Sequence, residues 1–342
     1  MKRVALLPAG SDPFLLAYWL RHYATWADEV DELRITVVGQ HNPVVLDYMA
    51  ACAAKVPHAR IIEAIPQRTD HGWTLRRMLD MSADAEHVLL LEDDAFVRRP
   101  GVVDERFGRI ERGAVDVIGT ARDNTDPPLI ARCKELWGEP WIGPSGESGY
   151  TLYPCFVFAR RSDLYRTDGN FGAAGWRTGE PIPGLGIAAF DWMTTDGRPQ
   201  ERMSGDTFTS AGWQLRSLGL RVEGESAYRS DAAHTMAAAQ DAPWFHVGSL
   251  STGVGCLFLP EVGSGTDPNL VALIRVPGEI RDWHKRMAWW TRVWEKWDGG
   301  IPGYHAEYGA ALHQAMEDVG AEPDAIAFWR ANYDPLVTWP EI

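Results

Sequence analysis

The stretch that decides the fold is His87 to Val97, which reads HVLLLEDDAFV. Its four consecutive apolar residues, Val88 to Leu91, are typical of a strand buried on both faces of a parallel sheet. Three carboxylates follow at once: Glu92, Asp93 and Asp94. Neighbouring carboxylates repel one another unless solvent or a cation offsets their charge, and hard oxygen ligands suit Mg²⁺ or Mn²⁺. The stretch therefore predicts a strand that ends in a metal-binding acidic cluster, with a solvated turn as the alternative.

The residues before this strand alternate between strand and helix patterns. The expected segments, in chain order, are 3–8, 13–26, 33–39, 43–55, 60–64 and 69–82, beginning with a strand. This β-α-β-α-β-α-β order predicts an α/β fold, a three-layer α/β/α sandwich around a parallel sheet with right-handed crossovers. Ligands of such sheets bind beyond the carboxyl ends of the strands, where the acidic cluster would lie.

The residues after the acidic cluster are less regular. Two segments, 121–150 and 169–199, are rich in Gly and Pro and are expected to be long loops with aromatic anchors. The remaining predicted strands are 115–120, 153–159 and 220–223, and the predicted helices are 131–136, 205–218, 277–297 and 305–319.

Composition narrows the class of protein. The chain has 33 basic and 47 acidic residues among its 342, a formal charge of −14, which argues against nucleic acid as a partner. Its four cysteines are scattered and have neither metal-ligand nor disulfide spacing, which indicates a reducing compartment. No window approaches 18 uninterrupted apolar residues. A soluble, cytoplasmic protein is expected.

The order of the elements, together with LLLEDDAFV, resembles the nucleotide-sugar-dependent glycosyltransferases of the GT-A type, most closely the family-2-like group. The resemblance covers about residues 3–255. It implies a GT-A (Rossmann-like) catalytic domain over 1–260 with a helical C-terminal extension over 261–342. Within the domain, 1–120 would bind the nucleotide sugar and 121–260 the acceptor. The implied cofactor is Mn²⁺ or Mg²⁺, and the implied donor is a nucleoside-diphosphate sugar, with UDP or GDP undecided.

The acidic cluster resembles the DxD element of this family, with Glu92 in place of the first Asp. The resemblance implies that Asp94 is the metal ligand, that Glu92 or Asp93 contacts the ribose or a metal-bound water, and that Glu92 is a further candidate ligand. Because the leaving group is a nucleoside diphosphate, a divalent cation would stabilise its growing negative charge.

A second motif, SGDTFTSAGWQLRSLGLRV at 204–222, resembles the family's acidic helix start before a GxRV strand. In inverting members this acid deprotonates the acceptor hydroxyl, so Asp206 is the candidate general base. The structural alternative is that Asp206 only caps the helix. Glu147 and Asp191 are the reserve candidates for the base.

A third motif, WFHVGSLSTG at 244–253, matches a position where several GT-A enzymes have a metal-binding His. It implies that His246 is a metal ligand and that Ser249 belongs to a small-residue loop that approaches phosphates. A core position is the alternative for His246, and His234 is a weaker competitor as the ligand.

The resemblance also predicts donor contacts near the N-terminus. The residues assigned to them are Pro8, Gly10, Arg68, Asp70 and Arg76. The sequence departs from the family after the second strand, where an Asp that meets the nucleobase is common. Here the segment is GQHN at 39–42, so the identity of the base stays open.

The acceptor is not identified by its candidate residues, the aromatic side chains between Trp137 and Trp192, which could stack on sugars or pack on one another. A glycan, a protein or a small molecule would all suit them. In the helix expected at 280–297, five residues, four of them Trp, recur on one face. This face would dock on the catalytic domain or on a second subunit, and peripheral membrane contact is the alternative.

The sequence therefore predicts a metal-dependent, inverting glycosyltransferase. The alternatives are a retaining enzyme of the same fold, a nucleotidyltransferase and a carbohydrate-binding protein without activity.

Overall fold

The structure is a computed structural model. It describes residues 1–10, 16, 19–20, 23–39, 43–67, 69–93, 95–97, 100–123, 127–142, 148–190, 192–193, 199–200, 202–205, 207–225, 228–229 and 244–246. The chain divides into two compact units that interleave along the sequence. Unit 1 comprises Met1–Pro8, Thr69–Glu92 and Val103–Ala227, and unit 2 comprises Ala9–Arg68, Asp93–Val102 and Tyr228–Ile342. The domain boundaries predicted at 120 and 260 stay predictions.

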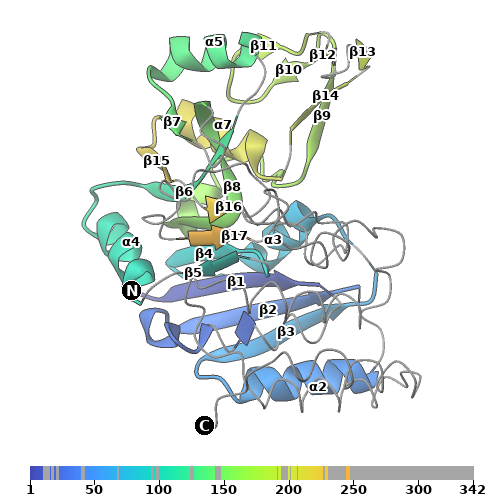
Figure 1. Cartoon of the computed structure of the whole chain (residues 1–342), viewed down its shortest axis with the longest axis vertical. Coiled ribbons are helices and arrows are strands. Elements are labelled where there is room, and N and C mark those ends of the chain that lie inside the picture. Colours follow the sequence, from blue (N-terminus) through green and yellow to red (C-terminus); the bar gives the residue numbers. More distant parts are fainter. Residues whose placement is uncertain are drawn as a thin grey trace, which may run out of the picture. The chain divides into compact units, whose positions relative to one another are not determined.

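The sheet of unit 1 contains the predicted acid-tipped strand. Its strands, in spatial order, are β15 (Val222–Glu225), β6 (Val117–Asp123), β8 (Ser148–Arg160), β4 (His87–Leu91) and β1 (Arg3–Ala9) (Figure 1). β1 and β15 run parallel to their neighbours β4 and β6. β8 runs antiparallel to both β4 and β6, so the expectation of a purely parallel sheet is wrong. The α/β class is confirmed.

Burial explains why these segments form strands. Val88 to Leu91 are 0% exposed, as are Val4 to Leu7 in the neighbouring β1. Fully burying one such side chain contributes about 1.5–3 kcal/mol. The four apolar residues before the acidic cluster are therefore core residues, as predicted.

The helices of unit 1 that the structure describes include α3 (His71–Asp80), α4 (Val102–Glu111) and α7 (Thr209–Ser217). The short helix α6 (Arg161–Leu164) follows β8 directly. No helix was predicted at α4, although Val103, Phe107 and Ile110 recur at helical spacing and are all 0% exposed. The ring of Phe107 meets that of Phe158 in β8 edge to face, with centroids 5.1 Å apart.

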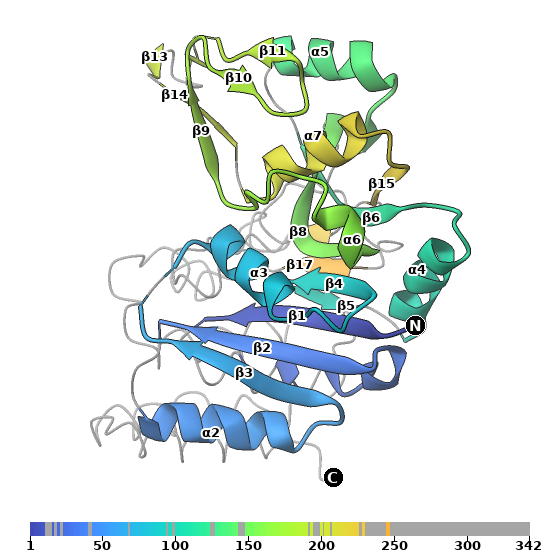
Figure 2. The same ribbon diagram turned by 180° about the vertical axis from the view of Figure 1, so that it is seen from behind.

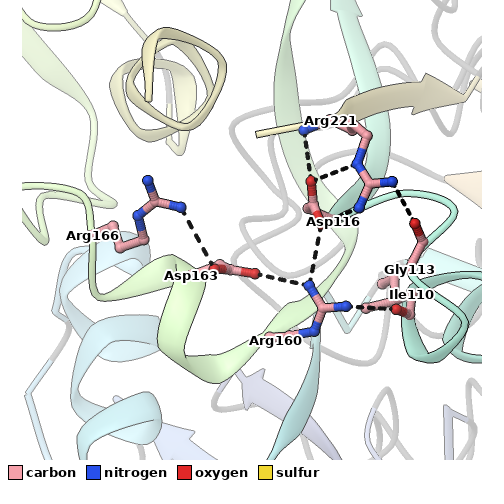
Figure 3. A network of polar contacts seen from close by, with 7 residues as sticks. All are labelled: Ile110, Gly113, Asp116, Arg160, Asp163, Arg166 and Arg221. Carbon is pink, nitrogen blue, oxygen red and sulfur yellow. Dashed lines mark hydrogen bonds and ion pairs between the residues drawn. The ribbon is translucent and has the colours of Figure 1, made fainter. Parts of the chain in front are cut away.

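A network of Arg and Asp side chains joins the ends of β6, β8 and β15 (Figure 3). Asp116, just before β6, accepts hydrogen bonds from the backbone and guanidinium of Arg221 at 2.8–3.0 Å. It also accepts one from Arg160 Nη1 at 3.2 Å. Arg160 also donates to the Ile110 carbonyl at 2.8 Å and so connects the C-terminal end of α4. Together these contacts hold the pKa of Asp116 well below its usual range.

The two Gly- and Pro-rich segments are more ordered than expected. They contain α5 (Pro127–Trp137), β7 (Trp141–Ile142) and the first residues of β8. Six short strands follow: β9 (Ala174–Arg177), β10 (Pro181–Ile182), β11 (Ile187–Ala188), β12 (Trp192–Met193), β13 (Pro199–Gln200) and β14 (Arg202–Gly205). Figures 1 and 2 show α5 with these strands at the end of unit 1 remote from β1. Leu129, Cys133 and Trp213 belong to the core that they share with α7.

Unit 2 contains a βαβ element, β2 (Glu32–Val38), α2 (Pro43–Ala54) and β3 (Ala59–Ile65). The two strands pair in parallel, and α2 runs along β3 (Figure 2). The short 3-10 helix η1 (Ala27–Glu29) precedes β2. Before it, Trp19, Tyr23 and Trp26 form a buried aromatic cluster with ring centroids 4.7–6.0 Å apart.

A three-stranded sheet in unit 2 has the order β16 (Tyr228–Arg229), β17 (Trp244–His246) and β5 (Ala95–Val97). The predicted helices 277–297 and 305–319, and with them the C-terminal extension, lie outside the described residues. Among the helices that the structure describes, none has the length and apolar character needed to cross a bilayer.

Candidate functional site

The acidic cluster lies just beyond β4, and its first carboxylate is enclosed by unit 1. Glu92 is 7% exposed. Its Oε1 lies 3.2 Å from His71 Nδ1 at the start of α3, and its Oε2 accepts a hydrogen bond from Cys155 Sγ at 3.3 Å. Both carboxylate oxygens therefore contact side chains of the protein. The solvated-turn alternative does not hold for Glu92.

The second carboxylate of the cluster, Asp93, belongs to unit 2 and is also 7% exposed. Its Oδ2 accepts a hydrogen bond from the backbone N–H of Gly10 at 2.7 Å. Two predicted donor-binding residues are thus brought together, because the carboxylate fixes the backbone directly after β1. Pro8, the third residue assigned near here, is a buried residue of β1.

The third motif meets the first through backbone pairing in unit 2. β17 pairs antiparallel with β5, in a register that sets Trp244 opposite Val97 and His246 opposite Ala95. His246 is therefore the cross-strand partner of the residue directly after Asp94. The side chains of Asp94 and His246 lie outside the described residues.

Two tryptophans support this pairing. Trp244 is 1% exposed and anchors the first position of β17. Trp19, at 0% exposed, donates its Nε1–H to the carbonyl of Ala95 at 2.9 Å. A buried indole usually finds such a partner for its N–H. Trp19 falls within the helix predicted at 13–26, but its contact with β5 was not predictable because β5 is distant in the sequence.

The start of α3 contains two of the predicted donor contacts. Asp70 is the N-cap, and its Oδ1 accepts the N–H of Trp73 at 2.9 Å, so the helix begins at His71. Arg76 donates to Asp80 at 3.2 Å, one helical turn on, and its guanidinium lies 4.3 Å from the ring centroid of Tyr165. Both side chains stabilise unit 1 locally. Arg68 lies outside the described residues.

The second motif forms its helix later than predicted. α7 begins at Thr209, and its N-cap is Phe208 without a side-chain capping bond. The predicted helix start at 205 is therefore wrong, and so is the alternative in which Asp206 caps this helix. Asp206 itself lies outside the described residues. Phe208 has left-handed backbone angles, φ 66° and ψ −6°, which cost about 1–3 kcal/mol for such a residue.

Contacts with a distant loop explain this unusual conformation. The N–H of Phe208 donates to the carbonyl of Phe171 at 2.7 Å, and the two rings lie 5.1 Å apart. Both residues are buried, at 0% and 1% exposed. The packing of Phe208 on Phe171 therefore outweighs the intrinsic preference of the backbone.

The same loop packs against α3 at Gly72. A Cβ on Gly72 would lie 2.0 Å from the Gly172 nitrogen and from the Phe171 carbonyl carbon, so only glycine fits. We call Gly72, Phe171, Gly172 and Phe208 the Gly72 junction. His71, directly before Gly72, contacts Glu92 of the first motif, and Phe208 lies directly before α7. The Gly72 junction therefore links the first motif to the start of α7 inside unit 1.

Most of the aromatic side chains expected to bind the acceptor contact other side chains of unit 1. The guanidinium of Arg216 lies 4.5 Å and 4.3 Å from the ring centroids of Trp137 and Trp141, and Tyr150 is 5.8 Å away. Burial in this cage lowers the pKa of Arg216 to about 10. Trp176 is buried against Trp213. These side chains thus pack on other side chains of unit 1, the side chain of Trp192 lies outside the described residues, and an acceptor role stays a prediction.

The residues predicted to hold the divalent cation are Asp94, His246 and Glu92, and only Glu92 has a described side chain. Among the described residues, no group of three His, Cys, Asp or Glu side chains could hold a metal ion. Asp94, His246 and Ser249 all have side chains outside the described set, as do the reserve acids Glu147 and Asp191. A carboxylate and an imidazole, the side-chain types of Asp94 and His246, are ligands that suit Mn²⁺.

No protein-family model matches the chain. No curated protein matches it either.

Solved structures do match. Glucosyl-3-phosphoglycerate synthase from Mycobacterium tuberculosis, in complex with Mn²⁺, UDP-glucose and phosphoglyceric acid, is 18% identical over 48% of this chain and 59% of that one, with a TM-score of 0.34. The named enzyme binds UDP-glucose. S. aureus TarS 1–349 is 12% identical over 95% of this chain and 82% of that one, with a TM-score of 0.41. A further mycobacterial protein is 20% identical, with a TM-score of 0.34, over 48% of this chain and 55% of its own.

The chain thus spans 55–59% of the length of the mycobacterial structures that it matches. The synthase among them is a sugar-nucleotide enzyme, the class that the sequence motifs resemble. At TM-scores below 0.5, none of these likenesses assigns a role to a residue.

Proposed function

We propose that this chain is a metal-dependent glycosyltransferase of the GT-A type. It moves a sugar from a nucleoside diphosphate to an acceptor hydroxyl with inversion. The observation that carries the proposal is the pairing of β17 with β5, which makes His246 the cross-strand partner of the residue after Asp94. Two segments that resemble the family's metal-binding motifs from distant parts of the sequence therefore meet at one point of the backbone.

Asp94 and His246 would hold the cation, and Mn²⁺ suits both a carboxylate and an imidazole. When bound, the cation offsets the negative charge that grows on the departing diphosphate. Gly10 and Asp93 support the proposal because their 2.7 Å contact fixes the backbone at Gly10, directly after the first strand. Glu92 is held by His71 and Cys155 in unit 1 and would contact the donor.

The base assigned to the reaction is Asp206. It would take the proton of the acceptor hydroxyl while the new bond forms at the anomeric carbon and the bond to the diphosphate breaks. The Gly72 junction supports this assignment, because it fixes the backbone two residues after Asp206 by burying Phe208.

The direct test is product formation from a panel of UDP- and GDP-sugars with Mn²⁺, in the wild type and in Asp94→Ala. The wild type should release nucleoside diphosphate, and Asp94→Ala should lose turnover together with Mn²⁺-dependent donor binding. NMR of the first product then distinguishes inversion from retention. If a donor binds equally well in EDTA and is never turned over, the chain is a carbohydrate-binding protein instead.

A further inference from the structure

His71, the first residue of α3, belongs to none of the motifs, yet it contacts the acidic cluster directly. Its Nδ1 lies 3.2 Å from Glu92 Oε1, opposite the thiol of Cys155 at 3.3 Å from Oε2. We propose that His71 is a positioning residue of the sugar-nucleotide site: it holds the carboxylate of Glu92 in the orientation that receives the donor. This inference depends on the proposed function.

The burial of Glu92 makes such a partner necessary. An ionised carboxylate that is 7% exposed is costly unless hydrogen-bond donors replace the lost water. A carboxylate can only accept, so the contact requires a proton on Nδ1 of His71. The thiol of Cys155 is a weak donor. His71 therefore supplies the stronger of these two contacts.

The geometry of His71 is itself fixed in advance. Asp70 caps the helix directly before it, and Gly72 directly after it packs against Phe171 and Gly172 without room for a Cβ. The backbone of His71 is thereby held on both sides, and an imidazole has only two side-chain torsions. A preorganised contact of this kind orients a binding group without an entropic cost at the moment of binding.

The role predicts where a defect appears in the kinetics. Losing His71 leaves the buried carboxylate of Glu92 with weaker hydrogen-bond donors. The carboxylate then reorients, and the sugar nucleotide binds less well. Removing a partner that orients a binding group typically costs 10- to 100-fold in affinity or activity. Because the acceptor and its base are not touched, we expect this loss in the KM for the donor, with kcat changed by less than about threefold.

The experiment compares His71→Asn with His71→Gln. The amide nitrogen of Asn takes the place of Nδ1, whereas that of Gln takes the place of Nε2. Asn should therefore keep a donor KM close to that of the wild type, and Gln should raise it by about 10-fold or more. A purely structural role would not separate these two variants. The control is His58→Asn, because His58 is an exposed residue with φ 61°, a conformation that Asn tolerates.

A double-mutant cycle with Glu92→Gln gives a second, independent readout. If His71 acts through Glu92, His71→Gln should add little to the donor KM once Glu92 is changed. Independent, multiplicative effects would overturn the proposal, as would equal KM values for His71→Asn and His71→Gln. If the wild type binds no UDP- or GDP-sugar with Mn²⁺, the proposed function itself fails and the inference fails with it.

Discussion

At the scale of single residues, Glu92 and Asp93, two neighbouring acids of the cluster, have different surroundings. Glu92 contacts the side chains of His71 and Cys155, whereas Asp93 accepts from the backbone of Gly10. Two of the three carboxylates therefore stabilise local structure at the tip of the strand. In the proposed mechanism, Asp94 is the acid of this cluster that binds the metal, together with His246. Repulsion between Glu92 and Asp93 is reduced because each carboxylate has its own hydrogen-bond donors.

The residue-scale prediction concerns the base. Asp206→Asn keeps the shape of the side chain but removes its ability to accept a proton, so turnover should fall by roughly 10²-fold or more. Binding of the donor with Mn²⁺, measured by calorimetry, should stay the same.

The matched control for this variant is Asp104→Asn, at a mostly exposed surface carboxylate that pairs with Arg3. It should change neither quantity. Unaltered turnover in Asp206→Asn would show that Asp206 is not the base. Asp191 and Glu147 would then be the candidates.

At the scale of elements, the residue at which α3 and α7 each begin depends on what packs against the start of the helix. α3 begins where Asp70 caps it and Gly72 lets a loop approach, and α7 begins after a left-handed Phe208 held by Phe171. Propensity alone would start α7 earlier, at the polar residues before it. Tertiary packing decides both starts.

Gly72→Ala tests this packing against a matched glycine. Its Cβ would meet backbone atoms at 2.0 Å, so α3 and the loop must separate, and unfolding free energy should fall by about 1–3 kcal/mol. Gly108 lies inside α4, where a Cβ would meet only the movable end of Arg112 at 2.9 Å. Gly108→Ala should be neutral or stabilise by about 0.5–1 kcal/mol, because Ala favours a helix. Equal effects in denaturant unfolding would contradict this account.

The Asp116 network predicts how stability depends on pH. The pKa of Asp116 is lower in the folded state, chiefly because of the hydrogen bonds from Arg221. Asp116 therefore contributes to the free energy of unfolding at pH values above its unfolded pKa of about 3.9. The contribution is then lost as the pH falls toward the lower folded pKa.

Asp116→Asn should therefore lower the free energy of unfolding by about 1–3 kcal/mol at pH 7. The difference from the wild type should shrink below about pH 4, because the unfolded wild type then binds a proton at Asp116 while the folded state still holds this carboxylate ionised. Denaturant unfolding at pH 7 and pH 3 checks this expectation. A difference that is constant between the two would show that charge at Asp116 is not involved.

At the scale of the whole molecule, the formal charge of −14 opposes the approach of a nucleoside diphosphate. A bound cation would offset this repulsion locally, so nucleotide and metal should bind with positive coupling. Ligands that bind only the folded chain raise its stability, by about 2.7 kcal/mol at a concentration 100 times the Kd.

Thermal unfolding can measure this coupling. We expect Mn²⁺ and the preferred nucleotide, UDP or GDP, to raise the Tm by a few degrees together and by much less when each is added alone. EDTA should abolish the joint shift. A nucleotide shift that is the same in EDTA would contradict a shared site for cation and diphosphate.

The sequence alone determined the features that depend on neighbouring residues. The buried strand before the acids follows from four consecutive apolar residues. The βαβ element of unit 2 follows from two apolar strand segments that flank a largely apolar helix with Pro at its first position. Only the tertiary structure decided the antiparallel direction of β8, the contact of His71 with Glu92, and the pairing of His246 with Ala95. Each of these joins segments distant along the chain. The local conformational preferences of a segment are the same whichever direction it runs and whichever segment it contacts. Tertiary packing therefore decides both.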